Sequence, residues 1–326
     1  MRAVVIERHG GPEVVAVRER AEPVPGPGEV SIDVRFAAVN YTDVRNRLGD
    51  GLGRVPFVPG VEVSGRVRRL GPGVDGLCVG EPVAALTRGG AHAEVATAPD
   101  VLTVPIASAL AERPESGAML VTVPVALVLL RHVARVRPGE RVLLHSAAGG
   151  VGTVAAQLAT LDGLQPLLGT VGALGPTDKV AFAKGHGYGE VFTYDDFADR
   201  VRALTGGRGV DVVLDPIGGA VRDASWELLA PFGRLVTYSN VSREPERAPE
   251  AEWLRARCVS WAGCSIGQLS ARAPGLLRPV LEEAVDLVAA GSVDLGVTRV
   301  LPLAEAPVAH RLFEERRAVG KLVLAV

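Results

Sequence analysis

The sequence predicts an α/β protein in two parts, a partly open antiparallel β-barrel followed by a doubly wound parallel sheet. Short strands separated by glycine and proline turns fill residues 2–96, a pattern typical of small barrels. From residue 119 onwards, apolar strands alternate with segments of helix length, as in parallel sheets covered by helices. A chain of 326 residues has room for both parts.

Six short strands are expected in the barrel, each bounded by turn residues. They cover residues 2–7, 14–18, 29–37, 62–70, 81–86 and 92–96. The turns between them include PVPGPGE at 23–29, GPG at 71–73 and GG at 89–90. This regular spacing of strands and turns predicts antiparallel pairing.

The second part begins with a helix and then alternates strands with helices. The expected helices cover residues 120–136, 151–162 and 179–184, and the expected strands cover 141–145, 165–169, 190–193, 210–214 and 233–238. Near the end of the chain, an amphipathic helix over 276–290 and a closing strand over 321–326 are expected. The alternation predicts a parallel sheet.

The composition excludes several classes of protein. Apolar residues make up 48% of the chain, so a sizeable core forms. A net charge of -2 argues against nucleic acid or an anionic membrane as the main partner. The most apolar stretch, residues 118–130, is shorter than the roughly 20 residues that span a bilayer. The N-terminus lacks a signal-peptide core, so the chain is expected in the cytoplasm.

The three cysteines are Cys78, Cys258 and Cys264, and no two of them form a C-x-x-C pair. An odd number without metal-site spacing argues against a disulfide framework and against a cysteine-built zinc site. We therefore expect them to be small buried hydrophobic residues.

The strongest local signal is an apolar strand that runs into a small-residue turn and then a helix, RVLLHSAAGGVGTVAAQ over 141–157. It matches the dinucleotide pattern G-x-G-x-x-G except that Ala147 takes the first position. Glycines there let a pyrophosphate approach the backbone at the helix N-terminus. A merely tight turn is the alternative. The candidate cofactor-binding residues are Ala148, Gly149, Gly150, Val151 and Gly152.

The second strand of this part predicts NADP rather than NAD. An NAD site usually carries an acidic residue about 20 positions on, which bonds the ribose 2′-hydroxyl. Here Thr170 and Gly172 end the strand, and the first acid is Asp178. Lys179 and Tyr194 instead offer a cation and a hydroxyl to a 2′-phosphate. The alternative for Lys179 is a solvated helix residue.

With these pieces in place, the chain resembles the quinone oxidoreductase branch of the medium-chain dehydrogenase/reductase family over nearly its whole length. The matching segments are PVPGPGEV at 23–30, VNYTDVRNRLG at 39–49, PFVPGVEVSGRV at 56–67, HSAAGGVGTVAAQLA at 145–159, TGGRGVDVVLDPIGG at 205–219 and GKLVL at 320–324. The resemblance implies a GroES-like domain over 1–118, a Rossmann domain over 119–265 and a return to the first domain over 266–326. It also implies an active site in the cleft between the domains.

The resemblance also implies that no zinc is bound. Zinc alcohol dehydrogenases of the wider family use a cysteine, a Gly-His-Glu segment and a second cysteine as ligands. This chain has Asn40 at the first position and Val61 in place of the histidine, and the four-cysteine structural zinc lobe is missing. Without zinc to hold an alkoxide, the acceptor must itself disperse charge, as quinones, enones and enoyl thioesters do.

Further site residues are implied by the resemblance alone. Tyr41 is the candidate catalytic residue, either donating a proton to the α-carbon of the substrate or only packing on the nicotinamide. Asn40 would bond near the nicotinamide ribose, and Asp43 would cap the following helix. Glu62 is expected to be structural, a buried carboxylate that tethers an arginine.

The remaining cofactor contacts also come from matching segments. Thr122 would lie near the carboxamide or the diphosphate. Ser239 and Asn240 stand where the family reads Gly-Asn beside the nicotinamide, so Ser239 is a departure. Lys321 would lie near the cofactor, with a surface salt bridge as the alternative.

Together these observations predict an NADPH-dependent reductase that acts on a small conjugated carbonyl substrate. The alternatives are a non-catalytic NADPH-binding protein of the crystallin type and a zinc alcohol dehydrogenase. A homodimer is expected because residues 261–266 form an apolar run at the predicted edge of the parallel sheet. No nucleic acid and no membrane is expected as a partner.

Overall fold

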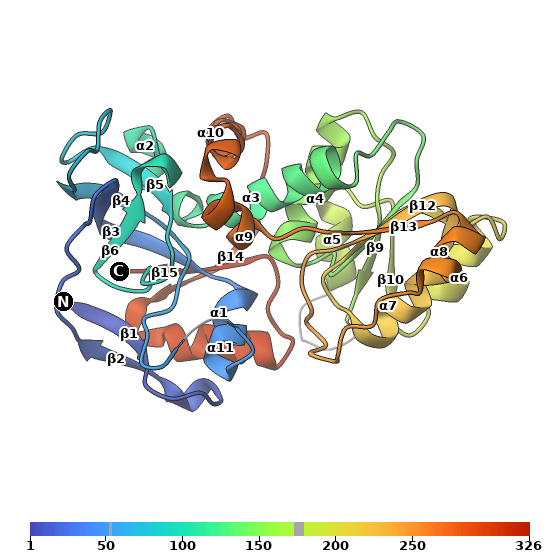
Figure 1. The fold of residues 1–326 in the computed structure, drawn as a ribbon, viewed down its shortest axis with the longest axis horizontal. Coiled ribbons are helices and arrows are strands. Elements are labelled where there is room, and N and C mark those ends of the chain that lie inside the picture. Colours follow the sequence, from blue (N-terminus) through green and yellow to red (C-terminus); the bar gives the residue numbers. More distant parts are fainter. Residues whose placement is uncertain (52–53, 173–178) are drawn as a thin grey trace. The chain divides into compact units, whose positions relative to one another are not determined.

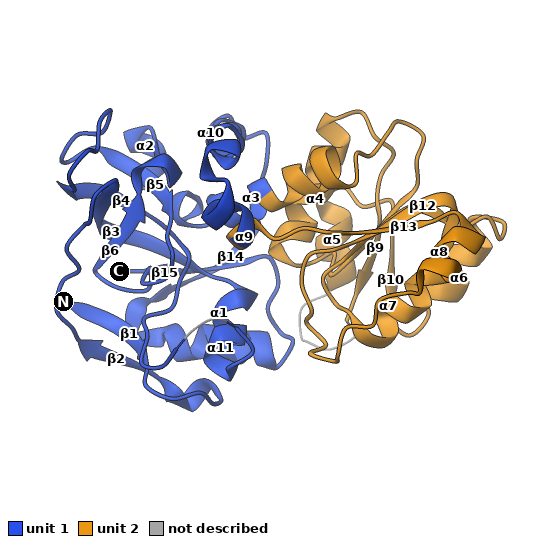
Figure 2. Ribbon diagram, viewed as in Figure 1, with its two compact units in different colours: residues 1–124, 268–326 blue, residues 125–267 orange. Residues whose placement is uncertain are grey.

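The structure is a computed structural model that describes residues 1–51, 54–172 and 179–326 (Figure 1). It divides into two compact units, one formed by 1–124 with 268–326 and the other by 125–267 (Figure 2). Helix α3 (Met119–Leu127) and helix α9 (Ile266–Arg272) contain the two boundaries. The sequence predicts boundaries a few residues earlier in each case.

The first unit is built on two antiparallel strands and a larger sheet. Strand β1 (Arg2–Ile6) pairs with β2 (Val15–Glu19). The seven-stranded sheet runs in the order β14-β15-β3-β4-β5-β7, with β6 also paired to β3. Its members are β3 (Glu29–Val39), β4 (Glu62–Leu70), β5 (Pro82–Leu86), β6 (Val95–Pro99), β7 (Thr103–Pro105), β14 (Val297–Pro302) and β15 (Lys321–Ala325).

The end of the chain completes this unit. Strand β15 inserts between β14 and β3, with Leu322 opposite Val39 and Leu324 opposite Ala37. All four side chains are buried, and Leu322, Leu324 and Val39 belong to one apolar cluster. The helices of the unit are α1 (Tyr41–Leu48), α2 (Ser108–Ala111), α10 (Pro274–Ala289) and α11 (Ala306–Glu314). Closing strand and barrel sheet therefore form one core.

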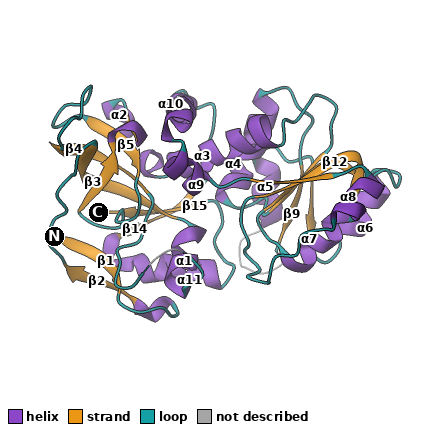
Figure 3. Ribbon diagram, viewed as in Figure 1, coloured by secondary structure: helices purple, strands orange, loops and turns teal. Residues whose placement is uncertain are grey.

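The second unit is a parallel sheet of six strands in the order β10-β9-β8-β11-β12-β13. The strands are β8 (Val142–His145), β9 (Leu168–Val171), β10 (Glu190–Thr193), β11 (Val210–Asp215), β12 (Leu229–Thr237) and β13 (Ser260–Gly263). Helices α4 (Gly150–Leu161), α5 (Lys179–Gly185), α6 (Phe197–Leu204), α7 (Gly219–Trp226) and α8 (Ala251–Arg257) connect them (Figure 3). The chain moves outwards from β8 in both directions, which is the doubly wound order. The predicted fold class is confirmed.

Several local predictions are corrected. The expected helix over 120–136 is α3 followed by a π-helical turn, Val128–Val133, and Pro124 inside α3 removes one helix donor. The strand expected over 92–96 begins only at Val95, where pairing with β3 begins, because Ala93 forms only an isolated bridge with Ala3. Cys78 and Cys258 are exposed and Cys264 is half-buried, so the cysteines are not the expected buried hydrophobic residues.

Candidate active site

The turn between β8 and α4 is tight, and its small residues are required by the backbone. A Cβ added to Gly149 would lie 2.8 Å from Oγ of Ser146, and one added to Gly152 would lie 2.5 Å from the Ser146 carbonyl oxygen. Ala148 is buried beside them. Ser146 has a φ of 65°, in the left-handed region. The predicted strand–turn–helix unit is therefore present at residues 142–161.

The first turn of α4 presents free backbone donors. Within the described residues, the N–H groups of Gly150, Val151 and Gly152 donate to no acceptor. The N–H of Thr153 is the first that is used, bonding the carbonyl of Gly149 at 2.9 Å. Free donors at the positive end of the helix dipole attract phosphate. The turn fits the diphosphate of a dinucleotide.

The ends of β9 and β10 are brought together because the two strands are neighbours. Gly172 follows β9, and a Cβ added to it would lie 3.7 Å from Cε2 of the Tyr194 ring, which follows β10. Lys179 is the first residue of α5 and is half-buried. Asp178 lies outside the described residues. A tyrosine thus stands beside the end of β9, where the sequence predicts the 2′-phosphate contact.

Thr170 turns its side chain into the interior of the second unit. Its Oγ1 lies 2.7 Å from Nδ1 of His145, whose Nε2 lies 2.7 Å from Oγ of Ser225. His145 is fully buried, and burial lowers its pKa to about 4 against the opposing charge of Asp215. The imidazole is therefore neutral at neutral pH and bridges two hydroxyls. A contact of Thr170 with a cofactor stays a prediction.

Ser239 and Asn240 follow the carboxyl end of β12. The Ser239 carbonyl accepts a hydrogen bond of 3.2 Å from Arg222. The Asn240 amide shapes the next loop, since its Nδ2 donates to the Glu244 carbonyl at 2.8 Å and its Oδ1 accepts from Ser242 Oγ at 2.8 Å. Both residues lie at the edge of the sheet where ligands bind in doubly wound folds.

In the first unit, the buried side chains of Lys321 and Glu62 form a network with half-buried Asn40. Nζ of Lys321 lies 2.9 Å from Oε1 of Glu62 and donates to Oδ1 of Asn40 at 2.7 Å. Nδ2 of Asn40 donates to the same Glu62 oxygen at 3.0 Å. The side chains of Lys321 and Glu62 are 3% and 1% exposed. The network therefore fixes the orientation of the Asn40 amide.

Helix α1 begins next to this network. Its first residue is Tyr41, half-buried, and its N-cap is Asn40. Asp43 accepts hydrogen bonds from the N–H of Asn40 at 2.8 Å and of Gly60 at 2.9 Å, which agrees with the expected capping role. Burial raises the pKa of Asp43, although nearby His92 and both backbone donors oppose the shift. The start of α1 is thus held by the Lys321–Glu62–Asn40 network and also by the hydrogen bonds to Asp43.

Glu62 also connects the network to helix α3. Its second oxygen, Oε2, accepts a hydrogen bond of 2.9 Å from the N–H of Val121. The neighbouring Thr122 is 3% exposed, and its Oγ1 donates to the carbonyl of Ala118 at 3.1 Å. Glu62 therefore joins three of the elements on which the sequence predicts site residues.

The prediction that Glu62 tethers an arginine is wrong, because its cationic partner is Lys321. The alternative of a surface salt bridge for Lys321 is also wrong, since both partners are buried. Arg222 was not predicted as part of the site. The sequence feature that could identify it is a basic residue soon after the D-P-I-G-G turn at 215–219, which follows the carboxyl end of a buried strand.

Within the described residues, no three histidine, cysteine, aspartate or glutamate side chains gather in a way that could hold a metal ion. No helix of the described chain is both long and apolar enough to cross a membrane.

Comparisons with known proteins agree with this arrangement. Residues 26–108 match the model of the alcohol dehydrogenase GroES-like domain, and residues 186–324 match the model described as zinc-binding dehydrogenase. A 2-haloacrylate reductase of Burkholderia sp is 32% identical over 99% of this chain and 98% of its own length. A quinone oxidoreductase of Pseudomonas aeruginosa is 31% identical, with 97% of each chain covered.

A solved mycobacterial structure, Rv1454c complexed with NADPH, has a TM-score of 0.91 and 33% sequence identity and covers both chains completely. These matches span the GroES-like unit and the Rossmann unit together. The chain belongs to the quinone oxidoreductase branch of the medium-chain dehydrogenase/reductase family.

Proposed function

We propose that the chain is an NADPH-dependent reductase that delivers hydride to the β-carbon of a conjugated acceptor without zinc. The observation that carries the proposal is the glycine turn before α4, where three consecutive N–H groups have no acceptor in the part of the chain that the structure describes. The related mycobacterial structure was solved with NADPH, which supports the same cofactor here. Gly149 to Gly152 would hold the diphosphate, and Lys179 and Tyr194 the 2′-phosphate.

The site does not fit a catalytic zinc ion. Where the zinc enzymes of the family carry a cysteine ligand, Asn40 already accepts a hydrogen bond from the ammonium of Lys321 at 2.7 Å. A dication placed there would meet a buried positive charge at close range, which is unfavourable in a medium of low dielectric. Val61 offers no ligand atom at the histidine position.

Bound NADPH supplies the hydride. The acceptor's own conjugation then carries the negative charge as an enolate, so no metal is needed to hold it. In this proposal the phenol of Tyr41 donates the proton that the α-carbon takes up. The network of Lys321, Glu62 and Asn40 keeps the start of α1 in place while this happens.

A survey of NADPH oxidation over quinones, alkenals, enones and enoyl thioesters tests the proposal. We expect turnover with at least one conjugated class and none with saturated ketones of the same size. Turnover of saturated ketones alone would contradict it. An absence of turnover with every class, together with NADPH binding, would favour the non-catalytic crystallin-type protein instead.

The cofactor preference is expected to depend on Lys179. In the wild type, NADPH should bind at least tenfold more tightly than NADH, about 1.4 kcal/mol. Lys179→Ala should erase most of this difference and leave NADH binding nearly unchanged, as measured by calorimetry. Lys184→Ala is the matched control, because Lys184 lies on the same helix and pairs with Glu190 at 3.2 Å. Equal affinities in the wild type would refute the 2′-phosphate assignment.

Removal of metal is expected to have no effect. After exhaustive dialysis against a chelator, the rate of NADPH oxidation should stay within error of the untreated enzyme, and elemental analysis should find no stoichiometric zinc. One tightly held zinc per chain that is lost together with activity would overturn the zinc-free mechanism.

A homodimer is expected to form through β13, the last strand of the parallel sheet. Its outer edge has no further strand of the described chain beside it, and its residues Trp261 and Ala262 are half-buried. Light scattering at micromolar concentration should give twice the mass of one chain. The variant Ala262→Lys should lower the measured mass towards that of a single chain. A monomeric wild type would contradict this.

A further inference from the structure

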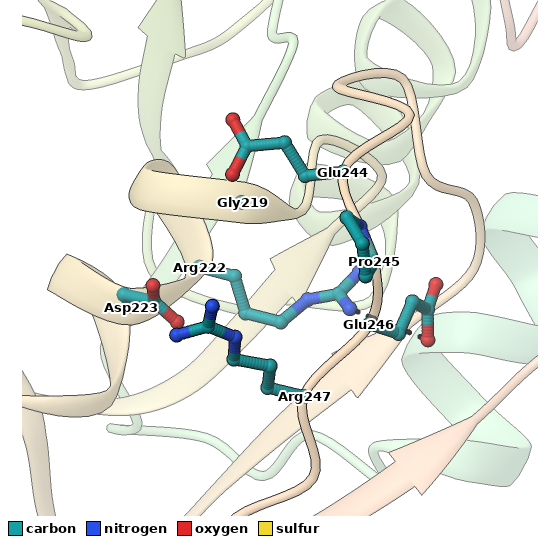
Figure 4. A pocket seen from close by; sticks show the side chains of 7 residues that line it. All are labelled: Gly219, Arg222, Asp223, Glu244, Pro245, Glu246 and Arg247. Atoms are coloured by element: carbon teal, nitrogen blue, oxygen red, sulfur yellow. Dashed lines mark ion pairs between the residues drawn. The ribbon is translucent and has the colours of Figure 1, made fainter.

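Arg222 on α7 is a buried arginine that joins three segments of the second unit. Its side chain is 3% exposed. Nε donates to Oδ2 of Asp215 at 2.6 Å, and Nη2 donates to Oγ1 of Thr237 at 2.7 Å and to the Ser239 carbonyl at 3.2 Å. Nη1 lies 3.4 Å from Oε2 of Glu246 (Figure 4).

These partners stand at one point of the sheet. Asp215 and Thr237 are the last register pair of β11 and β12, so Arg222 joins two parallel strands where both end. The fully buried Asp215 carboxylate also accepts hydrogen bonds from the N–H of Ile217 at 2.7 Å and of Gly218 at 3.2 Å. The carboxyl ends of the strands are the ligand-binding edge of such a sheet.

The bond from Arg222 to the Ser239 carbonyl orients the next N–H. The C=O of Ser239 and the N–H of Asn240 belong to one planar trans peptide, so they point in opposite directions. Because the carbonyl faces Arg222, the N–H of Asn240 faces away from α7. Within the described residues, neither this N–H nor that of Ser239 donates to a protein acceptor. Two donors are therefore left for a ligand.

We propose that Arg222 is a positioning residue that holds the Ser239–Asn240 peptide so that its N–H binds an acceptor on the nicotinamide end of NADPH. The inference rests on the proposed function, because it takes Ser239 and Asn240 as the segment beside the nicotinamide. The nicotinamide carboxamide carries a carbonyl oxygen, which is the kind of acceptor that a backbone N–H binds.

An arginine is needed because one planar group must reach both strand ends at once. Its fork uses two nitrogens: Nε donates to Asp215, and Nη2 donates to both Thr237 and Ser239. A lysine at the same position keeps a positive charge for Asp215 but has only one nitrogen. Arg222→Lys therefore loosens the Ser239 carbonyl while the buried carboxylate keeps a cation.

The test compares the whole cofactor with its adenosine half in the full-length protein. Calorimetry with NADPH and with adenosine 2′,5′-bisphosphate should show NADPH affinity about tenfold weaker in Arg222→Lys, or about 1.4 kcal/mol, and unchanged bisphosphate affinity. Thr237→Val leaves the Asp215–Arg222 pair intact but removes the Oγ1 that accepts from Arg222 and donates to the Ser239 carbonyl at 3.3 Å, so it should show the same pattern more weakly. Glu246→Gln is the control and should bind both probes like the wild type.

Two results would overturn the inference. The first is that both variants, Arg222→Lys and Thr237→Val, bind NADPH with wild-type affinity. The other is a parallel loss of NADPH and bisphosphate affinity in both variants, which a general loosening of the unit would produce. The binding comparison requires no turnover, so it is independent of the proposed function. That function fails separately, if the wild type binds NADPH but reduces no conjugated acceptor.

Discussion

Tyr41→Phe is expected to slow the reduction of an α-methyl enone or enoyl thioester by about 10²–10⁴-fold when protonation limits the rate. The reason is that the variant loses the one hydroxyl proposed to deliver the α-proton. Where solvent replaces the phenol without slowing turnover, the configuration at the α-carbon should instead become mixed. NADPH affinity should be unchanged. Steady-state rates and product stereochemistry in deuterated solvent measure both effects.

A quinone is the internal control for Tyr41→Phe. The oxygen of a hydroquinone takes its proton without help, so quinone reduction should proceed at the wild-type rate in the variant. Wild-type rate combined with wild-type α-stereochemistry on the α-methyl substrate would reduce Tyr41 to a packing residue, and solvent would then be the proton donor.

Glu62→Gln is expected to lower the free energy of unfolding by about 3–5 kcal/mol, because it leaves the ammonium of Lys321 buried without its counter-charge. Lys321 and Glu62 are almost completely buried, and their atoms lie 2.9 Å apart. Chemical denaturation followed by fluorescence measures the change. An effect below about 1 kcal/mol, the usual size for an exposed pair, would show that the network is weaker than its burial indicates.

The matched control is Glu190→Gln, which breaks the exposed pair with Lys184 at 3.2 Å and should cost less than about 1 kcal/mol. The double variant Glu62→Gln with Lys321→Met should recover much of the lost stability, because no unpaired charge is then buried. It should not recover activity, since the Asn40 amide loses the groups that orient it.

The parts of the fold predicted from sequence are those with a local cause. The turn before α4 and strand β4 follow from glycine spacing and from alternation over a few residues, and both are present. The sequence pattern does not predict strands β7 and β14 or helix α11. β7 has only three residues, and β14 depends on pairing with β15 rather than on its own pattern.

In the candidate site, too, residues within local motifs are predictable from sequence, whereas contacts between distant segments are not. The candidate residues could be named from motifs, but the partner of Glu62 could not, because Lys321 lies 259 positions further along the chain. Only the insertion of β15 beside β3 brings the two together. Arg222 was missed for a related reason, since its contacts with Thr237 and Ser239 require two strand ends to be neighbours.

In the proposed reaction, hydride passes from NADPH to the β-carbon of a conjugated acceptor. The most direct test is reduction of an enone with NADPH deuterated at C4 of the nicotinamide, with the position of the label in the product read by nuclear magnetic resonance. We expect a saturated ketone that carries deuterium on the β-carbon. Deuterium on the former carbonyl carbon, in an allylic alcohol, would contradict it.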